Sequence, residues 1–185
     1  MGRGRIAMER GEHVKLVEPT AALEAAFLDM AGDYRTAGEE RYQCIPELVR
    51  GDFAAYVNGL WRTAMGVGLR AGWVPTTTFW TVRNDTTIIG VVRLRHRLTP
   101  SLHLEGGHIG YDIRPSERNK GYGTLQLALT LEKARQRGLS RVLVTCDTDN
   151  VASAKIIQKN GGQFEGESIS PDSGQPVSRY WIDLA

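Results

Sequence analysis

The chain has 185 residues, 41% of them hydrophobic and 24% charged, values typical of a soluble globular protein. A formal net charge of only +2 argues against nucleic acid as a partner. No apolar run approaches the roughly 20 residues that cross a membrane, so no membrane partner is expected. The cysteines Cys44 and Cys146 share no C-x-x-C spacing, which excludes a disulfide framework and favours a reducing cytoplasmic location.

The amino terminus, residues 1–12, contains basic residues but lacks the apolar segment of a signal peptide. We interpret it as a flexible leader or an expression remnant. The remainder shows no internal repeat and no convincing linker. Residues 13–185 are therefore predicted to form a single domain.

The first half of this domain has mainly helical patterns. Residues 14–17 alternate in polarity and predict a short strand, after which Thr20 is a suitable N-cap for a helix. The polar, glycine-containing residues 32–43 are predicted to be a loop or a frayed helix end. Pro46 and Asp52 each begin a further helical segment.

From Thr76 the pattern changes to that of strands. Residues 77–82 are rich in β-branched and aromatic side chains, and a turn at 84–85 leads to a second predicted strand at 87–98. Residues 99–101 are predicted to form the next turn, directly followed by the strand that ends at Ile113.

Three arginines, Arg93, Arg95 and Arg97, share one face of the strand predicted at 87–98 because side chains alternate along a strand. Two interpretations stay open. The stripe recognises an anionic substrate, or it is a solvated face paired with acidic neighbours.

The central motif is Arg118-Asn119-Lys120-Gly121-Tyr122-Gly123, between a predicted strand at 107–113 and a predicted helix at 124–137. Free N–H groups and the positive end of a helix dipole converge at such a turn and favour a phosphate group. Glycines at positions 121 and 123 are expected to let the backbone approach the anion. The order of residues matches neither a Rossmann fingerprint nor a Walker loop.

A second strand and helix follow the first pair. Residues 141–146 are almost continuously apolar, as expected of a strand covered on both faces. Asn150 is placed to cap a helix over 151–159, and two further strands across a Pro/Ser/Gly loop complete the chain. The predicted fold is a single α/β domain.

These motifs resemble the GNAT superfamily of acetyl-CoA-dependent N-acetyltransferases. The family signature Q/R-x-x-G-x-G/A is similar to Arg118-x-x-Gly121-x-Gly123, and Ile113-Arg114-Pro115 stands where the family has an apolar-x-Pro segment. Asn150-x-x-Ser153 and Gly161-Gly162-x-Phe164 resemble the second element of the family. The resemblance covers residues 76–185 best.

The resemblance implies a mixed, mostly antiparallel sheet of six to seven strands, splayed in the middle, with helices on both faces. It also implies acetyl-CoA as co-substrate, bound where the strands diverge, and no metal. The implied contacts with acetyl-CoA are Tyr111, Asp112, Ile113, Arg118, Asn119, Lys120, Gly121, Tyr122, Gly123, Thr124, Asn150 and Ser153.

The chemistry implied by the resemblance is direct attack of a primary amine on the thioester, with a backbone N–H holding the oxyanion. Glu105 is the candidate general base, because it is expected near the start of the strand with the parity of Tyr111, a place that resembles that of a glutamate in some family members. Many members carry a tyrosine as the thiolate acid where this chain has Ile157. The acid is absent, supplied from elsewhere, or unnecessary.

The replacement at Ile157 keeps a second function open, a non-catalytic acyl-CoA-binding sensor or partner module on the same fold. The acceptor amine is not readable from residues 20–75, where helix patterns dominate. Resemblance to the family also leaves a homodimer open.

Overall fold

The computed structural model of the protein describes residues 11–42 and 51–184. The helix expected at Pro46 and most of the expected leader lie outside these ranges. The described elements are β1 (Val14–Val17), η1 (Ala21–Leu23), α1 (Glu24–Thr36), α3 (Phe53–Ala64), β2 (Thr76–Arg83), β3 (Thr87–Arg95), α4 (Pro100–Leu104), β4 (Ile109–Ile113), η2 (Pro115–Glu117), α5 (Tyr122–Gln136), β5 (Arg141–Asp147), α6 (Val151–Lys159), β6 (Gln163–Ile169) and β7 (Pro176–Asp183).

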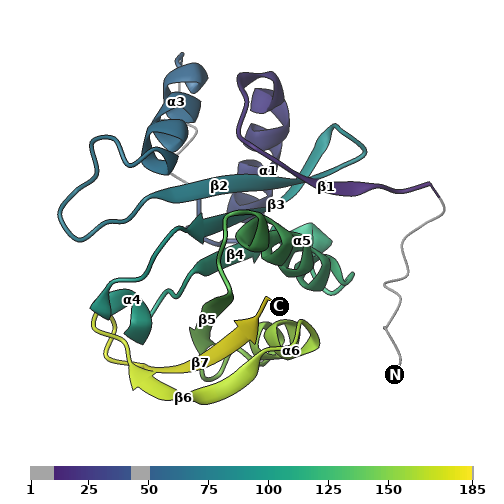
Figure 1. Cartoon of the computed structure of the whole chain (residues 1–185). Helices are drawn as coiled ribbons and strands as arrows, with labels where there is room; N and C mark the ends of the chain where they lie inside the picture. Colours follow the sequence, from purple (N-terminus) through teal and green to yellow (C-terminus); the bar gives the residue numbers. More distant parts are fainter. Residues whose placement is uncertain (1–10, 43–50, 185) are drawn as a thin grey trace.

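The strands form two sheets with the orders β1-β2-β3-β4 and β5-β7-β6, and neighbouring strands within each sheet are antiparallel. In the chain, α5 lies between β4 and β5. The two sheets meet at these two strands (Figure 1). The predicted α/β class with a mostly antiparallel sheet of up to seven strands is confirmed.

Helices cover both faces of the first sheet (Figure 1). On one face, α1 and α3 enclose an aromatic core that contains Phe27 and the fully buried Trp80 of β2. On the other face, Phe79 and Val92 pack with Leu127 of α5 in a second core that extends over β5 and α6. The alternation of β2 thus sends neighbouring aromatic residues into different cores.

The two sheets are joined at one end of the gap between β4 and β5. The backbone N–H of His108 donates to the carbonyl oxygen of Leu143 at 2.7 Å, and the N–H of Leu143 donates to Nδ1 of His108 at 2.9 Å. Gly107 permits this approach: its φ is +54°, and a Cβ there would lie 2.4 Å from the oxygen of Leu143. Beyond this junction β4 and β5 are not paired in a ladder within the described chain.

The imidazole of His108 therefore takes the place of a backbone group between the sheets. Burial, with lesser effects of His103 and Arg95, lowers the pKa of His108 to about 4. The neutral ring accepts a hydrogen bond at Nδ1, which puts its proton on Nε2. His108 thus has a structural role at the junction of the two sheets.

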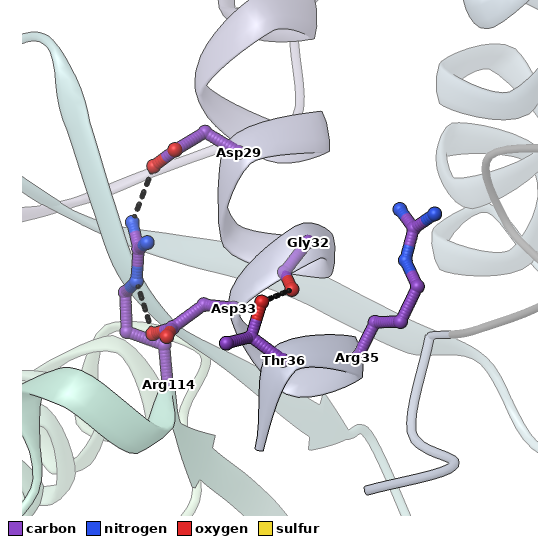
Figure 2. Close-up of a pocket in the computed structure, with 6 residues that line it drawn as sticks. All are labelled: Asp29, Gly32, Asp33, Arg35, Thr36 and Arg114. Carbon is purple, nitrogen blue, oxygen red and sulfur yellow. Dashed lines mark hydrogen bonds and ion pairs between the residues drawn. The ribbon is translucent and has the colours of Figure 1, made fainter. Parts of the chain in front are cut away.

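Arg114, just after β4, fastens the strand to α1 (Figure 2). Its Nε donates to Asp33 at 2.8 Å and its Nη1 to Asp29 at 2.7 Å. Burial opposes ionisation of Asp33, but hydrogen bonds from Arg114 and Ser116 outweigh it and lower its pKa. The surface depression drawn in Figure 2 is built around these paired charges, and none of its lining residues borders the gap between β4 and β5.

Three element boundaries differ from the prediction. The strand predicted to reach Leu98 ends at Arg95, because Thr99 caps a short helix, α4, through its hydroxyl and Leu102 N–H. The prediction that a turn at residues 99–101 leads directly into the next strand was therefore wrong. Of the two alternatives for residues 32–43, a loop starting at Gly32 was wrong, because the end of α1 continues to Thr36.

Candidate active site

The turn between β4 and α5 presents unused backbone donors. Asn119 and Gly121 have positive φ angles of 62° and 87°, and Gly121 is the N-cap of α5. In the described structure, the amides of residues 119–123 have no hydrogen-bond acceptor, whereas the amide of Thr124 donates to the carbonyl of Gly121 at 3.1 Å. Five consecutive free N–H groups at the positive end of a helix suit a pyrophosphate.

The charged side chains of this turn are already engaged. Arg118 donates to both carboxylate oxygens of Glu39 at 2.5 and 2.9 Å, and its Nε donates to the carbonyl of Ile113 at 2.9 Å. Lys120 lies 2.9 Å from Glu117, with half of its side chain exposed. The backbone amides are therefore the donors left free at this turn, whereas the charge of Lys120 is already paired with Glu117.

Tyr122 and Gly123, the last residues of the motif, act in packing. The hydroxyl of Tyr122 donates to Glu12 at 2.5 Å and accepts from Arg83 at 3.2 Å. A Cβ at Gly123 would lie 2.6 Å from Cδ1 of Ile156 on α6. A side chain at position 123 would therefore require Ile156 to shift, so Gly123 allows the present contact between α5 and α6. This role is different from the close anion approach that the sequence suggested.

This contact yields a prediction. Gly123→Ala is expected to destabilise the protein by about 1–3 kcal/mol, because a methyl group overpacks the contact with Ile156. Ile156→Val shortens the opposing side chain, and the double variant is expected to regain part of the loss. Urea unfolding of the four proteins measures it; equal losses with and without the second change would contradict the contact.

Tyr111 lies on the edge of β4 that faces the gap. Arg95 N–H donates to the carbonyl of His108, and Arg114 N–H to that of Ile89, which fixes the phase of the β3–β4 ladder. In an antiparallel pair successive residues alternate. The backbone groups of Asp112 therefore point to β3, whereas those of Tyr111 point into the gap.

Asp112 also directs its side chain elsewhere. Its carboxylate, almost entirely buried, accepts hydrogen bonds from the hydroxyls of Tyr34 at 2.7 Å and Tyr42 at 2.9 Å, and from Arg41 and Arg93. This network lies on the face covered by α1. The structure thus places Asp112 apart from the other predicted coenzyme contacts.

A cavity of about 230 Å³ lies between β4 and β5. It brings together residues from β3, the α4–β4 junction, β4, β5, α6 and β7. Its lining residues are Arg95, Glu105, Gly106, Ile109, Gly110, Tyr111, Thr145, Cys146, Asp147, Asn150, Ser153 and Val177. Because Gly110 and Tyr111 belong to opposite faces of β4, the cavity passes from the α6 side to the α1 side.

Two hydroxyl groups meet on the α6 side. The oxygen of Tyr111 lies 2.8 Å from Oγ of Ser153, and Asn150 caps α6 by accepting from the N–H of Ser153 at 3.0 Å. Burial raises the pKa of Tyr111 to about 12, so its hydroxyl stays protonated at neutral pH. Ile157, one turn further on, is fully buried in the core.

Cys146, on β5, also borders this side. Burial raises the pKa of its thiol, with a smaller opposing effect from Ser153. A protonated thiol is a weak nucleophile. This favours a packing role for Cys146, which belongs to the core formed by β5 and α5.

Glu105 is held by the loop between β6 and β7. Its side chain accepts a hydrogen bond of 2.5 Å from Ser170, whose oxygen also accepts from the amides of Asp172 and Ser173. Glu105 does not lie on the strand, as its parity with Tyr111 had assumed; it is the C-cap of α4. It nevertheless borders the cavity, because α4 ends beside the junction of the two sheets.

Arg95 is the cavity residue whose position the sequence left open. Its Nη1 donates to the carbonyl oxygens of Gly106 at 2.7 Å and Gly107 at 3.1 Å. Of the arginine stripe, Arg93 joins the network of Asp112, Arg95 borders the cavity, and Arg97 lies beyond the end of β3. The alternating strand pattern led to the same prediction for all three arginines. The fold gives each of them a different environment.

Ser170 was not identified from the sequence. It lies in the loop that follows β6, far from Glu105 along the chain, and no local pattern marks it. Among the described residues there is no group of three or more His, Cys, Asp or Glu side chains arranged to hold a metal. No helix in the described ranges has the length and apolar character needed to cross a membrane.

The observed groups fit acetyl-CoA. Free amides at 119–123 suit the pyrophosphate, and the open edge at Tyr111 suits the amide groups of the pantetheine arm. The cavity that Tyr111 borders is also lined by a carboxylate, Glu105. These features coincide at the boundary between the two sheets.

Known proteins share this architecture. The family model described as "Acetyltransferase (GNAT) domain" matches residues 15–163. An L-methionine sulfoximine/L-methionine sulfone acetyltransferase of Pseudomonas aeruginosa is 32% identical over 72 residues, which are 39% of this chain and 40% of that protein. The match thus spans less than half the length of this curated relative.

Solved structures resemble most of the chain. A coenzyme A complex of RimL, a ribosomal L7/L12 alpha-N-protein acetyltransferase, has a TM-score of 0.66 and 17% identity, covering 92% of this chain and 93% of its own. A microcin C7 self-immunity acetyltransferase, MccE, in complex with acetyl-CoA and AMP, has a TM-score of 0.65 and 14% identity, covering 92% of both chains. At these identities the likeness concerns the fold.

Proposed function

Because the chain belongs to the GNAT acetyltransferase domain family, we propose that it transfers the acetyl group of acetyl-CoA to a primary amine in a ternary complex. The observation that carries this proposal is the row of free amides at 119–123 beside the open edge of β4. The open edge at Tyr111 borders a cavity that also contains a positioned carboxylate, Glu105. The names of the similar acetyltransferases support the same activity.

The donor side is formed mainly by backbone. Amides of residues 119–123 hold the pyrophosphate, and the carbonyl of Tyr111 accepts a hydrogen bond from the pantetheine arm. Asn150 caps α6 and so holds Ser153 at the same wall. Acetyl-CoA supplies an activated thioester, and the protein supplies position and proton transfer.

On the acceptor side, Glu105 accepts the proton of the amine, directly or through one water. The hydrogen bond from Ser170 orients its carboxylate without removing its second oxygen. The N–H of Tyr111, which points into the gap, is suited to the oxyanion. Preorganised donors of this kind lower the barrier because they need no reorganisation during the reaction.

The leaving thiolate has a candidate proton donor although Ile157 is buried in the core. The hydroxyls of Ser153 and Tyr111 are hydrogen-bonded to each other at 2.8 Å and border the cavity. We assign them to stabilise and protonate the thiolate. This proposal adopts the alternative in which residues other than the one at position 157 supply the acid.

A two-step experiment tests the proposed function. Calorimetry is expected to show acetyl-CoA binding below about 1 mM, a usual upper limit for enzyme substrates. A thiol reagent is then expected to show CoA release that depends on an added amine, across a panel of amino acids, peptides and polyamines. Absence of binding would refute the donor site.

The same experiment separates the second candidate, a non-catalytic acyl-CoA-binding module. That module would bind acetyl-CoA and release no CoA with any amine of the panel. The isoleucine at position 157, buried in the core, is not an argument for such a module, because the hydroxyl groups of Tyr111 and Ser153 border the cavity.

We further propose a cytoplasmic location, which the cysteine usage and the supply of acetyl-CoA favour. A homodimer stays a proposal that the resemblance supports.

A further inference from the structure

Arg95 borders the active-site cavity with a charge that no described carboxylate neutralises. Both hydrogens of its Nη1 are used by the carbonyl oxygens of Gly106 and Gly107. Its Nε and Nη2 have no acceptor among residues 11–42 and 51–184. These two nitrogens form the edge of a guanidinium that binds a carboxylate in a bidentate manner.

The neighbouring arginine has the opposite environment. Nη1 of Arg93 lies 3.4 Å from the carboxylate of Asp112, and its Nη2 donates to the hydroxyl of Tyr42 at 3.1 Å. Arg95 has only carbonyl partners, and burial together with the charge of Arg93 lowers its pKa. A partly buried, uncompensated charge is costly for a protein unless a ligand pairs with it.

Arg95 and Glu105 are brought together by the backbone between them. Gly106 follows Glu105 directly and contributes the carbonyl that binds Arg95. The two side chains border the same cavity without forming an ion pair with each other. A positive and a negative group, held apart, match a small molecule with one amino group and one carboxylate.

The charges that border the cavity favour an acceptor with a carboxylate near its amine. A polyamine would bring additional positive charge toward Arg95. A peptide amino terminus lacks a carboxylate next to its amine, so it would leave Arg95 unpaired.

We propose that the acceptor is a small amine bearing a carboxylate, with a free α-amino acid as the model compound, and that Arg95 binds the carboxylate while Glu105 faces the amine. The inference rests on the proposed function because it names the acceptor of that same site. It also decides between the two interpretations of the arginine stripe, because of its three arginines only Arg95 binds the substrate.

The test compares compounds that differ only in the carboxylate. Free L-amino acids of acidic, basic, aliphatic and aromatic type are assayed beside their amides and spermidine, with CoA release as the readout. The best free amino acid is expected to exceed its amide by roughly 10- to 100-fold in kcat/KM, the range of one charge-assisted interaction. Equal or higher values for amides or spermidine would overturn the inference.

Variants locate the preference. Arg95→Gln is expected to reduce the ratio of acid to amide to about one, and Arg95→Lys to keep part of it, since an ammonium retains charge without the fork. Arg97→Gln, an exposed position beyond β3, is the matched control and is expected to keep the wild-type ratio. An unchanged ratio in Arg95→Gln would overturn the assignment, while calorimetry with CoA verifies that the variant is folded.

A binding measurement separates this inference from the proposed function. The CoA-loaded protein is titrated by calorimetry with the same amino acids and amides, which needs no turnover. Binding that requires both the carboxylate and Arg95, without CoA release in any assay, would support the acceptor site and refute the transferase. Transfer without a carboxylate preference would refute the acceptor site alone, as would equal or undetectable binding of acids and amides.

Discussion

Glu105→Gln is expected to lower kcat by about 100- to 10,000-fold, the usual contribution of a positioned general base. Glutamine keeps the shape of the side chain and can still accept the hydrogen bond from Ser170, but it cannot take a proton from the amine. Steady-state CoA release measures the effect, and calorimetry is expected to show unchanged affinity for acetyl-CoA.

The control for this change is Glu132→Gln, an exposed residue on α5 paired with Arg135. Its kcat is expected to equal that of the wild type. Near-normal kcat in Glu105→Gln would remove Glu105 from the mechanism.

Gly121→Glu is expected to weaken acetyl-CoA binding at least about tenfold more than Gly121→Gln does. Both side chains must adopt a φ near +87°, which costs any L-residue with a Cβ about 1–2 kcal/mol. They differ in the carboxylate, which adds negative charge at the N-terminus of α5, where the pyrophosphate would bind. Calorimetry measures affinity, and urea unfolding verifies that the two variants are equally destabilised.

Equal affinities of the Gly121→Glu and Gly121→Gln variants would argue against a phosphate at this turn. Gly123 is unsuitable for the same test. A side chain there meets Ile156, so its effects on folding and on binding cannot be separated.

The turn before α5 was predictable because its signals are local. Arg118 to Gly123 follow one another in the chain, and a strand, glycines and a helix start are enough to indicate free amides at a helix N-terminus. The cap at Asn150 was predicted for the same reason. The contacts of the side chains in this turn could not be predicted from local sequence, because Arg118 pairs with Glu39, which is distant in the chain.

The acceptor side depended on contacts between distant segments. Glu105 was chosen by strand parity, yet it reaches the cavity because α4, which the periodicity did not show, ends beside the junction of the sheets. Ser170, which orients it, comes from a different loop. The alternation of side chains does not show where a strand ends. Here the segment becomes a helix because the hydroxyl of Thr99 caps α4.

By itself, the sequence indicated most of the order of the elements, the family and a candidate donor side, because each rests on residues close together in the chain. Only the tertiary structure decided which arginine of the stripe borders the cavity, that Gly123 faces Ile156, and that Ile157 belongs to the core. Those features depend on how strands are paired and how helices approach one another. Such contacts are set by packing across the whole domain, which no local pattern encodes.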